Sequence, residues 1–172
     1  MGVLGVSLIF VAIALIVNGV GRLCKFDAKS SAAINLITGL VIVGANFIGL
    51  ARAQGDGDYV NIASGFLFGF TYLFIAANNI FGLDLRPFGW FSLFVAVYAG
   101  FMAVLAFAGL GPYTATDWRF GALWSAWAIL WLSGFVEIVC KVNLNKVFPF
   151  LSIAEGVFAA ALPAIVMLCG WW

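Results

Sequence analysis

Charged side chains are scarce in this sequence, and histidine is absent. Only 9% of the 172 residues are charged, and the formal net charge is +1. A soluble domain is about half apolar and about a quarter charged, whereas this chain is 65% hydrophobic, with a mean hydropathy of +1.15. A chain of this length cannot hide so much apolar surface inside itself. Composition therefore excludes a soluble enzyme, a nucleic-acid-binding protein and a disordered linker, and it predicts a membrane protein.

The residue patterns that carry catalysis or metal binding are missing as well. The absence of histidine removes the commonest general base, metal ligand and near-neutral pH switch. The three cysteines form neither a Cys-x-x-Cys motif nor a disulfide pattern. We find no nucleophile–base pair, no phosphate-binding loop and no metal-ligand spacing. We therefore expect no enzymatic activity, no cofactor and no metal site.

Six apolar segments account for most of the chain. Each is long enough to cross a hydrocarbon core of about 30 Å as a helix, and backbone groups in lipid require that helix. The segments are 3–20, 31–51, 62–81, 90–109, 120–140 and 148–169. Short loops make successive helices antiparallel. We expect an all-α membrane protein in which 1–172 form one six-helix transmembrane domain.

The distribution of Lys and Arg over the loops predicts the orientation in the membrane. The first, third and fifth loops carry Arg22, Lys25, Lys29, Arg86, Lys141 and Lys146. The second and fourth loops carry only Arg52 and Arg119. Because cytoplasmic loops are enriched in Lys and Arg, the odd loops are expected in the cytoplasm and both termini on the outer side.

The odd loops also resemble one another. Asp27 and Asp84 are 57 positions apart, and Asn143 follows 59 positions after Asp84, each beside a basic residue. The spacing predicts three two-helix hairpins of similar design, which would leave a pore between them, since weak repeats are common in transport folds. The alternative interpretation is that basic, helix-capping composition recurs in cytoplasmic turns.

Stripes of side chains on three spans are candidates for the wall of such a pore. Trp124, Trp127 and Trp131 lie at i, i+3 and i+7, which is one face of a helix. Ordinary helix or lipid packing explains the same stripe. Two further stripes leave the same choice open; they consist of Phe68, Thr71, Tyr72 and Ile75, and of Ser7, Val11, Leu15 and Asn18.

Polar groups inside the spans are the remaining candidates. Glu155 lies about 10 Å into the last helix, where a carboxylate must face water, meet a partner or be neutral. Glu137 precedes Lys141 by four residues, the spacing of an ordinary helical ion pair. Asn18 and Asn78 suit either an interhelical hydrogen bond or the rim of a pore. We expect Pro163 to kink the last helix.

Motifs along nearly the whole chain resemble the urea channel and amide transporter family (AmiS/UreI). They are Leu8–Gly19, Gly65–Leu73, Phe81–Pro87, Trp90–Ala96, Trp124–Glu137 and Ile153–Gly156. The resemblance implies six helices, arranged as three two-helix hairpins around a pore in each protomer. It also implies a homohexamer with lipid at its centre, in a bacterial inner membrane.

The resemblance also assigns the pore wall. It implies an outer constriction that involves Val11, Leu15, Trp124 and Trp127. It implies an inner one that involves Phe68, Thr71, Tyr72, Leu130 and Trp131. Asn18 matches a polar position near the inner mouth, and Glu155 matches an acidic position that faces the pore.

The function implied by the resemblance is passive passage of urea or short-chain aliphatic amides such as acetamide. The best-known relative in this family opens in acid through histidines in long periplasmic loops. This sequence contains no histidine, so we expect a constitutively open channel. Two alternatives remain: proton-coupled transport through Glu155, and docking of a cytoplasmic amidase or urease.

Overall fold

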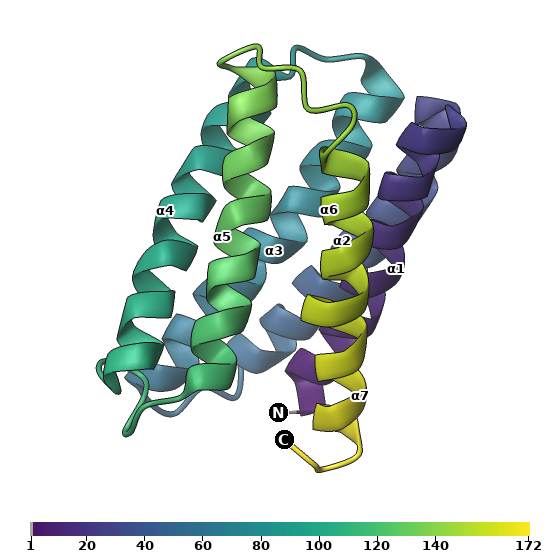
Figure 1. Ribbon diagram of the computed structural model, residues 1–172. Helices are drawn as coiled ribbons and strands as arrows, with labels where there is room; N and C mark the ends of the chain where they lie inside the picture. The colour runs from purple at the N-terminus through teal and green to yellow at the C-terminus, as the bar shows by residue number, and fades with distance from the viewer. Residues whose placement is uncertain (1) are drawn as a thin grey trace.

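The computed structural model describes residues 2–172, and six membrane-length helices dominate it (Figure 1). All six are long and apolar enough to cross a membrane, so the six predicted spans are confirmed. Five of the spans are α1 (Gly2–Cys24), α2 (Ala28–Leu50), α3 (Asp56–Phe81), α4 (Arg86–Ala108) and α5 (Trp118–Ile138). The sixth span consists of α6 (Phe148–Glu155), the π-helical η1 (Gly156–Ala161) and α7 (Leu162–Leu168).

The helices form a ring in chain order. Each packs mainly against the helices before and after it, and α1 closes the ring along α6, η1 and α7. The closest pairs are α2 with α3, α4 with α5, and α1 with the sixth span. The loop repeat indicated other pairs, namely the two helices that flank each odd loop. The fold nevertheless consists of three closely packed two-helix units.

Small residues explain which helices pair closely, because in lipid the close approach of helices depends on van der Waals packing. A Cβ added at Gly39 of α2 would lie 2.6 Å from the side chain of Leu73 on α3. One added at Gly121 of α5 would lie 2.6 Å from the ring of Phe107 on α4. One added at Gly19 of α1 would lie 2.6 Å from the carbonyl oxygen of Pro149 on α6. Each of the three closely packed helix pairs thus has at least one glycine at the contact between its helices.

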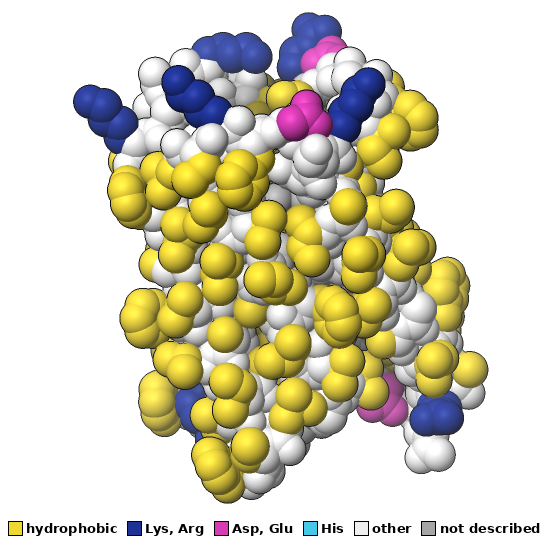
Figure 2. Space-filling view, turned by 90° about the vertical axis from the view of Figure 1, so that its right-hand side faces the viewer, with side chains coloured by type: hydrophobic (Ala, Val, Ile, Leu, Met, Phe, Trp, Pro, Cys, Tyr) yellow, Lys and Arg dark blue, Asp and Glu magenta, His cyan; other side chains and the backbone are white. Residues whose placement is uncertain are grey.

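The two ends of the ring differ in charge. The loops 25–27, 82–85 and 139–147 lie at one end, which we call the basic end, and both chain termini lie at the other, the terminal end (Figure 1). Figure 2 shows Lys and Arg gathered at the basic end, above a belt of apolar side chains on that face. The belt is the surface expected of a protein whose middle contacts lipid.

The three loops of the basic end share a backbone turn. Lys25, Gly82 and Lys141 all adopt left-handed conformations, with φ of 55°, 65° and 61°. They follow α1, α3 and α5, and each precedes the repeat residue of its loop by two positions. A left-handed backbone conformation is strained for residues other than glycine. Its recurrence two positions before the repeat residue in all three loops confirms the repeat of these loops.

The repeat residues also make equivalent hydrogen bonds. Side-chain oxygens accept a backbone N–H from the start of the next segment in all three loops. The bonds are Ser30 N to Asp27 (2.8 Å), Arg86 N to Asp84 (2.9 Å) and Asn145 N to Asn143 (3.0 Å). The bonds to Asp27 and Asp84 satisfy backbone donors that the starts of α2 and α4 leave without a partner, whereas the bond to Asn143 lies within the loop before α6. Shared turn chemistry is therefore the physical basis of the sequence repeat.

Candidate functional site

Two cavities enter the ring from its opposite ends. The cavity at the basic end measures about 610 Å³, and the cavity at the terminal end about 700 Å³. Val11, Phe68 and Trp127 line both of them. These three side chains, from α1, α3 and α5, therefore form the wall at which the two cavities meet.

An aromatic cluster surrounds this meeting point. The ring of Phe68 lies edge-on to three indoles, with centroid distances of 6.0 Å to Trp124, 4.8 Å to Trp127 and 4.6 Å to Trp131. Trp124 and Trp127 also meet edge-on at 5.1 Å. All three indoles are buried. The tryptophan stripe of α5 thus faces the interior of the ring, and α3 supplies the phenyl ring that meets it.

Hydrogen bonds fix the orientation of each indole. Trp131 Nε1 donates to Thr71 Oγ1 on α3 (3.2 Å), and Trp127 Nε1 donates to the carbonyl oxygen of Ala159 in η1 (3.2 Å). Trp124 Nε1 donates to the hydroxyl of Tyr113 (2.8 Å), in the loop between α4 and α5. A buried indole N–H needs such an acceptor. Because protein groups accept the hydrogen bonds of all three indole N–H groups, the indoles present only carbon atoms to the cavities.

The interruption of the last span explains the bond to Ala159. In α-helical register the Ala159 carbonyl would accept the N–H of residue 163, and proline has none. The backbone instead forms a π-helical segment that ends at Ala161, before Pro163, and π-helical bulges accompany bends in helices. Trp127 supplies a donor that the proline cannot. The π-helical segment therefore helps to orient the indole of Trp127, which lines both cavities.

The remaining candidates on α1, α3 and α5 face the basic-end cavity. Leu15, Asn18, Tyr72 and Leu130 line it, together with Thr71 and Trp131. The Asn18 amide exchanges two hydrogen bonds of 2.9 Å with that of Asn35 on α2, which is fully buried. Asn18 is thus both an interhelical link and part of the cavity wall. Trp124 lines the cavity at the terminal end.

Glu155 is the candidate that stands apart. It is 6% exposed, at the end of α6 where η1 begins, and its Oε2 has no hydrogen-bond partner within residues 2–172. The residues that line the two cavities do not include it. Its carboxyl group is therefore held inside the ring without a basic partner, at the boundary of the π-helical segment.

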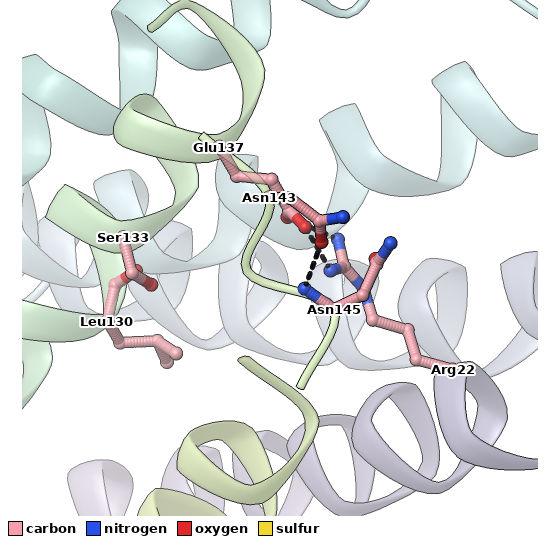
Figure 3. Close-up of polar contacts among 6 residues, drawn as sticks. All are labelled: Arg22, Leu130, Ser133, Glu137, Asn143 and Asn145. Carbon is pink, nitrogen blue, oxygen red and sulfur yellow. Dashed lines mark hydrogen bonds and ion pairs between the residues drawn. The ribbon is translucent and has the colours of Figure 1, made fainter. Parts of the chain in front are cut away.

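The mouth of the basic-end cavity contains an ion pair that the sequence did not indicate. Arg22 of α1 reaches Glu137 near the end of α5 through two contacts of 2.8 Å (Figure 3). The guanidinium also lies 4.2 Å from the ring centre of Phe148 on α6. The expected pair of Glu137 with Lys141 is wrong, because α5 ends at Ile138 and Lys141 turns away in a left-handed conformation. Arg22 thus ties α1 to α5 across the mouth.

Asn78, near the end of α3, is the most conspicuous polar group in the wall of the basic-end cavity. It is 4% exposed, yet neither its amide nitrogen nor its amide oxygen has a hydrogen-bond partner among the described residues. Leaving a buried polar group unpaired costs about 1–3 kcal/mol. Most buried polar groups in proteins are paired, so the unpaired amide of Asn78 is an exception among residues 2–172.

Two tyrosines of the site were not among the candidates. Tyr98 of α4 shares a 2.8 Å hydrogen bond with Ser64 of α3 and meets Trp124 edge-on at 6.1 Å. Tyr113 is the acceptor for Trp124 described above, and burial raises the pKa of its hydroxyl. Because a buried indole N–H needs an acceptor, the tryptophans themselves indicated that such an acceptor lies nearby. The sequence did not indicate which hydroxyl would meet it.

Fold and site together define a multi-pass membrane protein with two cavities that meet at an aromatic wall. The chain belongs to the AmiS/UreI family of transporters, since the sequence model of that family matches residues 3–171. It is 37% identical to the acid-activated urea channel of Helicobacter pylori, over 98% of this chain and 99% of that protein.

Two further comparisons agree. The crystal structure of the Helicobacter pylori urea channel superposes with a TM-score of 0.87 at 38% identity, covering 98% of this chain and 99% of that one. A Mycolicibacterium smegmatis protein is 34% identical, over 98% of this chain and 78% of that protein, and its name provisionally assigns it to the transport of amidate substrates. The resemblance seen in the sequence motifs is thereby confirmed.

Proposed function

We propose that the protein is a passive channel for urea and short-chain aliphatic amides such as acetamide. The observation that carries the proposal is the junction at Val11, Phe68 and Trp127, where cavities from the two ends share one apolar wall. A solute that leaves one cavity at this point enters the other. Relatives named for urea and for amidate substrates support the choice of solute.

The chemistry of the junction favours an uncharged, planar solute. Moving a charged group away from water is expensive unless a partner compensates it, and Val, Phe and Trp side chains offer no ionic partner. A neutral amide loses less hydration, and its flat face can lie against the indole and phenyl rings. Polar groups of the basic-end cavity, such as Asn18 and Thr71, then lie beyond the junction.

The proposed channel is open without an acid trigger. The Helicobacter pylori relative is named as acid-activated, but this sequence contains no histidine to titrate between pH 5 and 8. Aspartates as a class titrate at lower pH. Asp27 and Asp84 have their pKa lowered further, chiefly by hydrogen bonds from Ser30 and Arg86, respectively.

The proposal includes a place in the cell. The charge at the basic end favours the cytoplasmic side of a bacterial inner membrane, which would put both termini outside. A homohexamer is the assembly that the family resemblance implies. Exposed apolar side chains along the outer faces of α2 and α4, such as Leu40, Phe94 and Phe101, are compatible with contact to lipid or to another copy.

Proton-coupled transport is the second candidate, and the burial of Glu155 with an unpaired oxygen favours it. The two candidates differ in one measurable property. A coupled transporter accumulates solute against a gradient when a pH difference is applied, and Glu155→Gln abolishes that accumulation. A channel equilibrates solute with or without the pH difference, and the same substitution only alters the rate.

Stopped-flow permeability of proteoliposomes to urea and acetamide, at pH 7.5 and pH 5, tests the proposal. We expect fast flux of at least one solute at both pH values, above that of protein-free liposomes. Flux that appears only at pH 5 would contradict the open channel and restore acid gating. Absence of flux at both pH values, in vesicles shown to contain folded protein, would reject a passive channel altogether.

A further inference from the structure

The environment of Asn78 separates it from the other buried amides of the chain. Asn18 and Asn35 bind each other, and the amide nitrogen of Asn46 donates to the carbonyl oxygen of Ile42 at 2.8 Å. Asn78 alone among the described residues is a buried amide that leaves both its nitrogen and its oxygen without a partner. Helix packing does not use this side chain as an interhelical hydrogen bond.

The position of Asn78 places it on the route of a solute. Thr71, Ile75 and Asn78 follow one another at i, i+4 and i+7 on α3, and all three line the basic-end cavity with Tyr72. Phe68, one turn before Thr71, belongs to the junction of the two cavities. A solute that passes the junction toward the basic end therefore moves along this stripe and reaches Asn78 after the hydroxyl of Thr71.

The chemistry of a carboxamide selects its partner. Its N–H donors and carbonyl acceptor lie side by side in one plane, as they do in urea and in primary amides. Two such groups can bind through a pair of antiparallel N–H···O bonds formed at once. A water molecule or a polyol hydroxyl does not present a donor and an acceptor in that fixed planar arrangement.

We propose that Asn78 is a binding station for the amide group of the passing solute, reached along α3 beyond the junction and Thr71. This inference rests on the proposed function. Both polar atoms of Asn78 are shielded in the cavity wall, so the side chain turns about its own rotatable bonds to meet the solute. The two bonds replace hydration that the solute gave up at the junction, which lowers the barrier for amides and leaves other small molecules unaffected.

Two substitutions at Asn78 test the station. Asn78→Leu keeps the approximate volume and removes both hydrogen-bonding groups, and Asn78→Ala removes them while widening the cavity. The control is Asn79→Leu, the adjacent amide on the same cavity wall, which is only partly buried. The measurement is permeability to urea, to acetamide and to water per folded channel, in proteoliposomes whose channel content is quantified.

We expect urea and acetamide permeability to fall roughly tenfold relative to water in both Asn78 variants, which corresponds to about 1.4 kcal/mol in the barrier. The decrease in Asn78→Ala is the sharper result, because a wider cavity without a lost binding group would conduct faster. Asn79→Leu should retain the wild-type ratio.

Two outcomes would overturn the inference. One is an unchanged ratio of amide to water permeability in folded Asn78→Leu and Asn78→Ala channels, since Asn78 would then be an unpaired amide without a role in transport. The other is an equal loss in Asn79→Leu, which would show a general effect of polarity in this wall. Wild-type protein that conducts neither urea nor acetamide would instead reject the proposed function itself, and the two failures are therefore distinguishable.

Discussion

The anchored indole of Trp127 gives the sharpest prediction about selectivity. Trp127→Phe keeps an aromatic ring at the junction but removes the donor to the Ala159 carbonyl and part of the ring surface. The indole is 3% exposed and contacts Phe68 and Trp124 edge-on. A phenyl ring at this position loses its fixed orientation and leaves space beside Phe68.

The magnitude follows from the lost bond. A neutral hydrogen bond contributes about 0.5–1.5 kcal/mol net, and about 1 kcal/mol corresponds to roughly a fivefold change in an equilibrium. The anchored orientation of the ring should therefore become about fivefold less dominant. We expect permeability to butyramide, relative to acetamide, to rise by about the same factor. Loss of the bond and of packed atoms should also lower the free energy of unfolding by about 1–3 kcal/mol.

The assay compares butyramide with acetamide in stopped-flow vesicles, so that the number of channels cancels in the ratio. Trp90→Phe is the matched control, because Trp90 is 59% exposed on the outer surface of α4 and meets Phe135 rather than the junction. An unchanged butyramide-to-acetamide ratio in folded Trp127→Phe would refute the assignment of this indole to the narrow part of the passage. A change of equal size in Trp90→Phe would refute it as well.

Three further predictions address the elements around the passage. Pro163→Ala supplies an N–H to the Ala159 carbonyl in competition with Trp127, so the butyramide-to-acetamide ratio should rise as it does in Trp127→Phe; an unchanged ratio would disconnect the π-helical segment from selectivity. Arg22→Met leaves Glu137 without its partner and should lower the thermal midpoint, whereas adding Glu137→Gln should recover part of the loss, as a double-mutant cycle measures; additive losses would show that the pair is energetically uncoupled. The pKa of Asp27 is lowered from its ordinary value of 3.8, so the stabilisation by this cap is present above that value and is lost as pH falls below it; the difference in thermal midpoint between the wild type and Asp27→Ala should therefore be level from pH 8 to 5, and a decrease of this difference between pH 7 and 5 would contradict the assignment.

Much of the architecture was accessible from the sequence because lipid imposes a simple rule. Apolar runs of sufficient length must be helices, and all six runs are. The tryptophan stripe was predictable from the sequence as well, since helical spacing alone puts Trp124, Trp127 and Trp131 on one face. What the spacing left open was whether that face meets lipid or the ring interior, and the rings around Phe68 decide it.

The pairing of the helices was less accessible. The repeat in the odd loops is real, yet it reflects turn and capping chemistry and does not determine which helices pack together. Close packing depends on glycines such as Gly39 and Gly121, whose partners Leu73 and Phe107 lie on other helices. Sequence spacing within one helix carries no information about such contacts.

Partners across the ring were the least predictable feature. Glu137 has a basic residue four positions later, but the helix ends before that residue, and Arg22 lies far away in the sequence and close in space. The acceptor for Trp127 is a backbone carbonyl, which has no signature in side-chain type. Pro163, four residues after Ala159, was the one local indication that this carbonyl would be available.

The proposed route has two different regions, an aromatic cluster without free donors and, further along, the unpaired amide of Asn78. This order suits a neutral amide. In the aromatic cluster around the junction all three indole N–H groups already have a protein acceptor, so a solute there meets aromatic and aliphatic carbon and must give up most of its hydration. An ion would lose far more than a neutral amide under that condition. The unpaired amide of Asn78 lies beyond the junction, where a partially dehydrated solute next arrives. If selectivity depends on this order, a substitution in each region should change a different permeability. Trp127→His, which places a second polar ring nitrogen at the junction, should raise water permeability more than amide permeability. Asn78→Leu should lower amide permeability alone. Water permeability separates the two steps, because it should rise in the indole variant and stay at the wild-type value in Asn78→Leu. An equal change of water permeability in both variants would show that the two regions do not act as separate steps.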